Sequence, residues 1–274
     1  MSAEALPYTL LILLSEVTIG SIWVLWAADM RGYLAPTFLK FGAALSMVMA
    51  ALTFVLAAKI AAPDEVDGYP LDSAFMPATR VLLAVLLAAS IPYAIATLAE
   101  WRIAGLAGGL LCSLIGLASI AVMAQVFALP VWGYAGVLIS LVAGALAVGA
   151  VSMGMVLGHW YLITPRLPEQ PLREMTAFLL LALALQLLIL IPNTALPHDS
   201  VASSVHVSIG ESPFFWMRIA GGIAFPMVLT YMAYDSSGAR AMQSATGLLY
   251  LAMALVLSGE ILAKALMFVT GVPG

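Results

Sequence analysis

The apolar positions of the chain gather into long uninterrupted segments that are separated by short polar stretches. A membrane-spanning helix needs about 20 mostly apolar residues. Eight segments reach that length, and none alternates polar and apolar residues as a barrel strand does. The expected spans are residues 7–29, 37–60, 80–99, 104–128, 132–162, 174–195, 214–234 and 241–270. The pattern therefore predicts an all-α polytopic membrane protein, with eight transmembrane helices in a bundle that forms one transmembrane domain over residues 1–274.

Turn-forming residues separate the spans and leave little of the chain outside the membrane. Glycine and proline mark the boundaries, as at Arg31-Gly32 and Pro36. The two longest connections, about 61–79 and 196–213, are each shorter than twenty residues, so we expect no soluble domain. The first apolar run has no basic segment before it and reaches spanning length. We interpret it as a retained helix and not as a cleaved signal peptide.

Small residues predict close contacts between helices. Gly105 and Gly109, like Gly154 and Gly158, follow the small-xxx-small pattern of packed transmembrane helices. We interpret both pairs as packing within the bundle rather than between copies of the chain.

Composition supports the same class and excludes others. The chain is 64% hydrophobic and 9% charged, with a mean hydropathy of +1.09, whereas soluble domains carry roughly 25% charged residues. The net charge is −4 and no basic patch for phosphates is present, so we expect no nucleic-acid partner. The single cysteine, Cys112, cannot form an internal disulfide.

The distribution of basic residues predicts the orientation in the membrane. Connections one, three, five and seven and their flanks carry six basic residues: Arg31, Lys40, Arg102, Arg166, Arg173 and Arg240. The other face has only Lys59 and Arg80, together with the acidic residues Glu4, Asp64, Glu65, Asp67, Asp72, Asp199 and Glu211. By the positive-inside rule, both termini are expected outside the cytoplasm.

Three charged residues lie well inside expected spans. Glu260 and Lys264 stand four residues apart, so one helix face carries both groups. Glu16 lies in the middle of the first span without a basic residue within one turn, and Lys264 and Arg218 are the available cations. Charges at this depth cost at least about 2.5–3.5 kcal/mol each and usually mark a pathway. A buried ion pair that fixes helix orientation, or a protonated Glu16, is the structural alternative.

Two further residues are site candidates with competing interpretations. Arg218 lies about one turn inside the seventh span, where it either snorkels to the interface or pairs with a buried carboxylate or a quinone oxygen. His159 closes the fifth span next to Trp160 and Tyr161, which are typical of an interfacial belt. Its alternative role is a polar contact at a quinone site.

The sequence lacks the residues that several classes of cofactor require. A bis-histidine haem needs two facing histidines within spans, and His159 is the one candidate because His198 and His206 lie in a connection. Haem is therefore not expected. No metal site is expected, since the histidines lack ligand spacing and no Cys-x-x-Cys is present. Retinal is excluded because eight spans do not fit a seven-helix plan, and no nucleotide-binding or nucleophile motif occurs.

Three motifs resemble one family. The stretch Gly259-Glu260-Ile261-Leu262-Ala263-Lys264-Ala265-Leu266-Met267-Phe268 is similar to the pattern Gly-Glu-hydrophobic-x-x-Arg-x-hydrophobic-Phe-Tyr in the membrane anchor subunits of dimethyl-sulfoxide-reductase-type complexes, the DmsC/NrfD-like group. Trp216-Met217-Arg218-Ile219 resembles that group's Trp-Arg-Ile opening of the seventh helix. Leu157-Gly158-His159-Trp160-Tyr161-Leu162 stands where the anchors have a Leu-Gly-Tyr-Leu run. Chain length, eight spans and outside termini agree loosely along the whole chain.

The resemblance implies a subunit that exchanges electrons with quinol or quinone near one membrane face. Electrons would pass to an iron–sulfur subunit and from there to a molybdenum catalytic subunit. Glu260 and Arg218 match the family's positions, and Lys264 replaces an arginine, which keeps the charge without the planar guanidinium. The family's histidine-containing run between helices two and three is replaced by Ala62-Pro63-Asp64-Glu65. A prokaryotic cytoplasmic membrane is the expected location.

We therefore predict a membrane subunit of a multisubunit respiratory or redox complex. It would anchor iron–sulfur and catalytic redox subunits, bind no covalent cofactor, and exchange electrons and protons with a membrane quinone. Glu16 or Glu260 would take up protons, while Arg218 or Lys264 would polarise a quinone oxygen. Two alternatives stay open. One is a small proton- or ion-coupled transporter, although no inverted repeat is visible; the other is a structural or assembly subunit.

Overall fold

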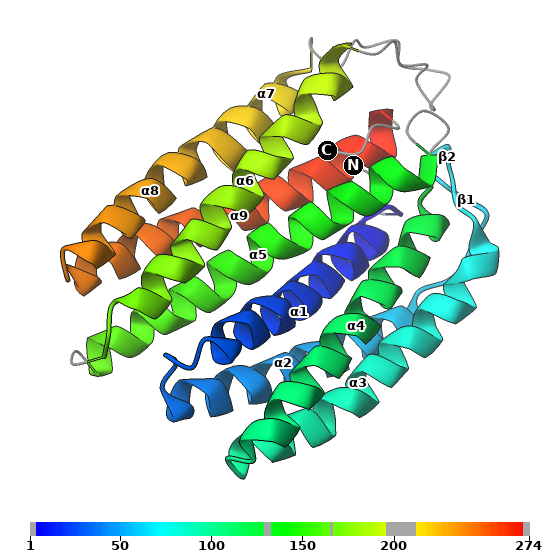
Figure 1. The fold of residues 1–274 in the computed structure, drawn as a ribbon. Coiled ribbons are helices and arrows are strands. Elements are labelled where there is room, and N and C mark those ends of the chain that lie inside the picture. The colour runs from blue at the N-terminus through cyan, green and yellow to red at the C-terminus, as the bar shows by residue number, and fades with distance from the viewer. Residues whose placement is uncertain (1–3, 129–132, 165–166, 196–211, 271–274) are drawn as a thin grey trace.

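The computed structural model describes residues 4–128, 133–164, 167–195 and 212–270, and its described part is a bundle of long helices (Figure 1). Eight helical segments of it are long and apolar enough to cross a membrane, which confirms the all-α polytopic fold. Six of these segments are single helices with the bounds α1 Leu6–Met30, α2 Pro36–Lys59, α4 Arg102–Val126, α5 Gly133–Ile163, α6 Gln170–Ala195 and α9 Met242–Thr270. The third is α3 Met76–Leu98, preceded by the 3-10 turn η1 Ser73–Phe75.

The seventh span is one helical segment, Pro213–Gly238, that contains a π-turn. It consists of α7 Pro213–Ile219, the π-helical turn η3 Ala220–Ala224 and α8 Phe225–Gly238. Such π-turns are rare and occur often at functional sites. The single seventh span predicted from the sequence is confirmed, but the π-turn within it was not predicted, because it leaves the apolar run uninterrupted.

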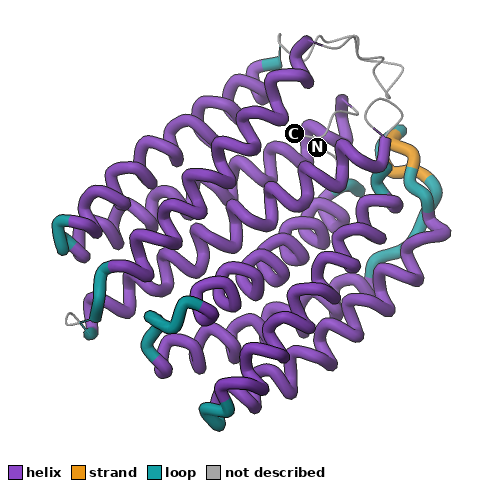
Figure 2. The backbone as a smooth tube through the Cα atoms, in the orientation of Figure 1, coloured by secondary structure: helices purple, strands orange, loops and turns teal. Residues whose placement is uncertain are grey.

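Two central helices are the most completely buried of the eight spans. In Figure 1, α6, α5, α1 and α4 lie side by side, with α8 beyond α6. Of their most apolar stretches, 72% of α5 and 67% of α1 are buried, against 33% of α2. The connections gather at the two ends of the bundle (Figure 2). Helices α1 and α5 therefore form the core, and α2, α4, α6 and α9 pack on one or both of them.

A small hairpin that the sequence pattern did not predict covers one end of the bundle. Strands β1 Glu65–Val66 and β2 Tyr69–Pro70 pair antiparallel, and both turn residues, Asp67 and Gly68, have positive φ. An Asp-Gly turn is a typical hairpin signal. The Tyr69 hydroxyl donates to the Phe127 carbonyl at 2.7 Å, and its ring packs on Phe268 with centroids 5.2 Å apart. The hairpin thereby closes the bundle where α1 begins and α9 ends.

Ion pairs tie the helices together at the opposite end. They join Arg31 to Glu174 (3.1 Å), Lys40 to Glu100 (2.7 Å), Arg102 to Asp29 (2.6 Å) and Arg240 to Glu169 (2.7 Å). The hydrogen bond from Lys40 holds the pKa of the Glu100 carboxyl below its ordinary value. Four of the six basic residues used to predict orientation are thus paired with acidic residues. The positive-inside rule counts basic residues and gives little weight to acidic ones, so these ion pairs do not alter the predicted orientation. The orientation itself stays a prediction. Arg166, Asp199 and Glu211, like His198 and His206, lie outside the described residues.

Candidate functional site

Five polar side chains meet inside the bundle, close to the middle of the helices. They are Glu16 of α1, Gln186 of α6, Arg218 of α7, and Glu260 and Lys264 of α9, and each is at most 5% exposed. Glu16 stands ten residues from the start of α1 and Glu260 ten residues from the end of α9. At 1.5 Å per residue, both lie about 15 Å from the same end of the bundle. We call these five residues the buried ion cluster.

Glu260 is the centre of the buried ion cluster. Its Oε1 accepts hydrogen bonds from Gln186 Nε2 at 2.6 Å and from Arg218 Nη2 at 3.0 Å. Its Oε2 accepts one from Lys264 Nζ at 2.7 Å, across one turn of α9. Arg218 Nη2 also donates to Gln186 Oε1 at 3.1 Å. A carboxylate with three donors is a well-satisfied buried anion.

Glu16 is held far less firmly than Glu260. Its Oε1 lies 2.8 Å from Lys264 Nζ as an ion pair, which is its one close polar contact among the described residues. Its Oε2 has no hydrogen-bond partner among the described residues. Lys264 thus lies between two carboxylates, and only one of them is fully engaged. With both acids ionised and both bases protonated, the buried ion cluster has no formal net charge.

Glycines make room for the buried ion cluster. A Cβ on Gly144 of α5 would overlap Glu16 Oε1 and lie 3.0 Å from Glu260 Oε2. A Cβ on Gly259 would lie 2.5 Å from the Cα of Gly222, in the π-turn, and 2.9 Å from Arg218 Nη1. Arg218 Nη1 donates to the Gly222 carbonyl at 3.4 Å, so the side chain runs inward along its own helix. The π-turn and these glycines therefore leave the space that the charged side chains occupy.

Replacing Gly144 with alanine is expected to lower the free energy of unfolding by about 1–3 kcal/mol, because the methyl group must displace the Glu16 carboxyl from Lys264. The measurement is denaturant unfolding in mixed micelles. Gly247→Ala is the control, since a Cβ at Gly247 meets nothing within 4 Å. Equal stability of the two variants would contradict the close contact between Gly144 and the Glu16 carboxyl.

The structure brings together four of the five predicted site residues. Glu16, Arg218, Glu260 and Lys264 share one site, whereas His159 stands apart. His159 is exposed near the end of α5, fifteen residues or about 22 Å along the helix from Gly144, and its Nδ1 lies 3.2 Å from the Tyr250 hydroxyl. His159 is therefore not part of the buried ion cluster, and its role at a quinone site stays a prediction.

Two details of the buried ion cluster differ from the sequence-based interpretation. The snorkelling alternative for Arg218 is wrong, because its side chain is fully buried and pairs with Glu260. Gln186 was missed, although an amide within the apolar run Leu183-Ala184-Leu185-Gln186-Leu187 is a usable signal. Among the described residues, no three His, Cys, Asp or Glu side chains gather as a metal site would require.

Comparisons with family models, with curated proteins and with solved structures found no match for this chain. The resemblance of the last-helix motif to the membrane anchor subunits therefore stays a prediction.

Proposed function

We propose that this chain is the membrane subunit of a multisubunit redox complex and that its buried ion cluster takes up and releases protons during quinone chemistry. The observation that carries the proposal is the incompletely bonded Glu16 carboxyl beside Lys264, deep within apolar helices. Intramembrane ionisable groups usually mark substrate or proton pathways. The motifs around Glu260 and Arg218 support the same class of complex.

The contacts suggest different roles for the two carboxylates. Glu260 is fixed by Arg218, Lys264 and Gln186, so we assign it to holding the two cations in place. Among the described residues, Glu16 has one ionic contact and its Oε2 has no hydrogen-bond partner, so we assign it to proton uptake. A quinone oxygen would have to displace Glu260 or Gln186 to reach Arg218 Nη2, and Arg218 Nε, although unpartnered among the described residues, is buried. We therefore assign protons to the buried ion cluster and propose that the quinone binds outside it.

The described connections are too short to form a redox domain, which supports partner subunits that carry the electrons. Two electrons from quinol oxidation require an acceptor, and an iron–sulfur subunit followed by a catalytic redox subunit is the class that the motifs imply. We propose a prokaryotic cytoplasmic membrane with both termini outside. In this scheme the two protons of the quinol pass to water through Glu16.

The test is isolation of the chain with its native partners, followed by quinol oxidation assays. We expect iron–sulfur protein to co-purify, and we expect Glu16→Gln to lower turnover about 100-fold or more, as loss of a positioned proton acceptor does. Glu65→Gln, at an exposed hairpin carboxylate, is the control. Wild-type turnover of Glu16→Gln with intact partner content would reduce the buried ion cluster to a structural role.

A proton- or ion-coupled transporter is the second candidate, and the π-turn in the seventh span favours it. Such turns occur often at functional sites, and η3 follows directly after α7, which carries the cluster's Arg218. Uptake of protons or ions by the isolated chain in proteoliposomes would support this function. A tight vesicle without such uptake would exclude it.

A further inference from the structure

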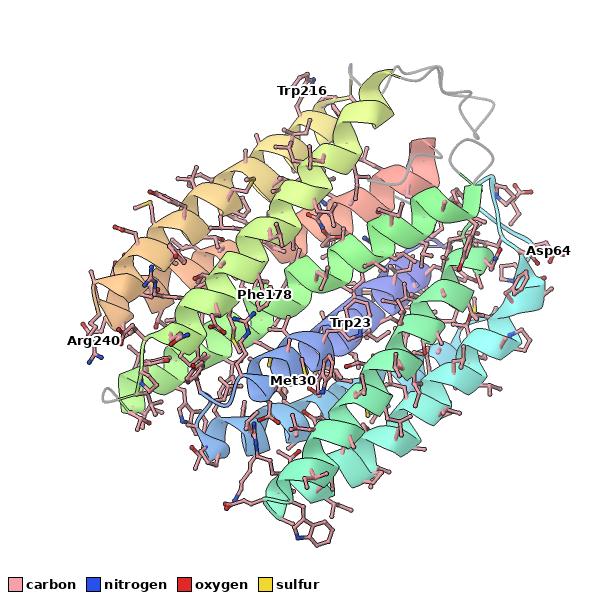
Figure 3. All side chains as sticks on the ribbon, viewed as in Figure 1. Trp23, Met30, Asp64, Phe178, Trp216 and Arg240 are labelled. Atoms are coloured by element: carbon pink, nitrogen blue, oxygen red, sulfur yellow. The ribbon has the colours of Figure 1, made fainter. Side chains whose placement is uncertain are left out.

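A crevice runs between α1 and α6, in the half of the bundle nearest the ion-paired end. Both helices pack on α5, but they have little contact with each other. The crevice has a volume of about 280 Å³, and Trp23, Trp26 and Ala27 of α1 face Phe178 and Ala182 of α6 across it. Trp23 and Phe178 are labelled on their two helices in Figure 3. Leu181 and Leu185 lie on its exposed rim, so the crevice opens toward lipid.

The walls of the crevice require an apolar occupant. The only side-chain donors among its lining residues are the two indole N–H groups. Trp23 Nε1 donates to the Ser113 carbonyl at 3.0 Å, and Trp26 Nε1 donates to the Leu106 carbonyl at 3.1 Å, both on α4. From Phe178 to Leu185 the crevice extends about 10 Å along the helix axis. This length is about two thirds of the hydrocarbon layer of one leaflet, so a single acyl chain is long enough to fill the crevice.

A cation stands at the interfacial end of the crevice. Arg31 caps α1 one turn beyond Ala27, and its guanidinium carbon lies 5.9 Å from the centroid of the Phe178 ring. The side chain is 51% exposed, and Nη1 faces Glu174 Oε1 at 3.1 Å. That oxygen also accepts from Gln170 Nε2 at 3.1 Å. A guanidinium has five N–H donors, so Arg31 retains donors that can bind a phosphate.

We propose that this crevice binds one acyl chain of an anionic phospholipid whose phosphate pairs with Arg31. The apolar walls accept the chain, and the cation at the membrane interface complements the headgroup. An isoprenoid quinone tail would fit the walls but carries no phosphate for the Arg31 donors that Glu174 leaves available. The site does not depend on the function proposed for the buried ion cluster.

Native mass spectrometry of the full chain, released from vesicles that contain phosphatidylglycerol and phosphatidylcholine, tests the proposal. We expect one retained phosphatidylglycerol per chain. Ala27→Phe fills the mouth of the crevice and should abolish retention; Ala182→Leu narrows the crevice from α6 and provides a second, smaller change. Arg31→Gln should lower retention about fivefold, as expected for one interfacial cation.

Two controls separate the phosphate contact from the ion pair. Glu174→Gln removes the partner of Arg31 but leaves the cation, so retention should stay equal or rise. Leu114→Phe enlarges an exposed side chain on α4, away from the crevice, and should change nothing. The proposal is overturned if Glu174→Gln lowers retention as much as Arg31→Gln. It is also overturned if phosphatidylcholine is retained equally, or if both crevice-filling variants keep the lipid.

Discussion

Glu260→Gln is expected to lower the free energy of unfolding by about 3–5 kcal/mol, the cost of removing one partner from a buried ion pair. Glutamine keeps the shape of the side chain but removes the charge that faces both Arg218 and Lys264. Within the buried ion cluster, Glu16 would then be the one carboxylate left for two buried cations, and of these it contacts Lys264. Arg218 would keep a hydrogen bond to Gln186 but lose its anion. Denaturant unfolding in mixed micelles measures the change.

A double variant shows whether charge balance is the cause. Arg218→Gln combined with Glu260→Gln removes one charge of each sign and restores formal neutrality. We expect the double variant to be more stable than the sum of the single losses, by about 0.5–3 kcal/mol. The exposed carboxylate variant Glu65→Gln should stay within about 0.5 kcal/mol of the native chain. Strict additivity of the two cluster substitutions would mean that the Arg218–Glu260 ion pair contributes nothing.

The eight spans could be predicted because the membrane imposes a length of apolar sequence that is visible without tertiary information. The first and last residues of the helices were less predictable, because a charged residue can lie inside a helix when neighbouring groups bind its charge. Helix α3 begins at Met76, before the predicted 80, and Arg80 donates to the carbonyls of Ala57 and Ile60 at the end of α2. Helix α6 begins at Gln170, before the predicted 174, and Arg173 stacks on Tyr234.

The site could be predicted only in part. The Glu260–Lys264 contact follows from helical spacing, which is local. Pairing Glu16 with Lys264 and Arg218 with Glu260 depends on which helices are neighbours, and the sequence offered both cations without choosing between them. Gln186 was harder to recognise, because an uncharged amide in a span is a weaker signal than a charge. The inward path of Arg218 depends on the π-turn and on the Gly222–Gly259 contact, which no periodicity reveals.

Glycine spacing within one helix identified some packing residues but missed a tight contact between α1 and α5. Of the two predicted pairs, Gly109 and Gly158 meet a neighbouring helix, with Trp26 and Thr246 within 3 Å of an added Cβ. Gly105 and Gly154 have room for a methyl group. Gly20 of α1 and Gly149 of α5, which belong to neither predicted pair, lie where the backbones of the two helices approach closely. A motif within one helix cannot identify a contact to which each helix contributes a single glycine.

The second large effect is expected at this helix crossing. A Cβ on Gly149 would overlap the backbone carbonyl of Gly20, and a Cβ on Gly20 would overlap the backbone carbonyl of Ala145. Backbone cannot rotate away as a side chain can, so α1 and α5 must separate. We expect Gly149→Ala to lower the free energy of unfolding by at least about 3 kcal/mol, the upper end of the usual cost of overpacking.

The same substitution should also disturb the buried ion cluster, because Gly20 lies one turn from Glu16, and Gly149 lies five residues from Gly144, on the crossing helices. Separation of α1 from α5 would draw Glu16 away from Lys264. Gly154→Ala is the matched control on α5, where the nearest atom to an added Cβ is 3.8 Å away, and it should stay within about 1 kcal/mol of the native chain. Unfolding in mixed micelles measures both variants. If they prove equally stable, the backbone contact between Gly20 and Gly149 does not hold the two central helices together.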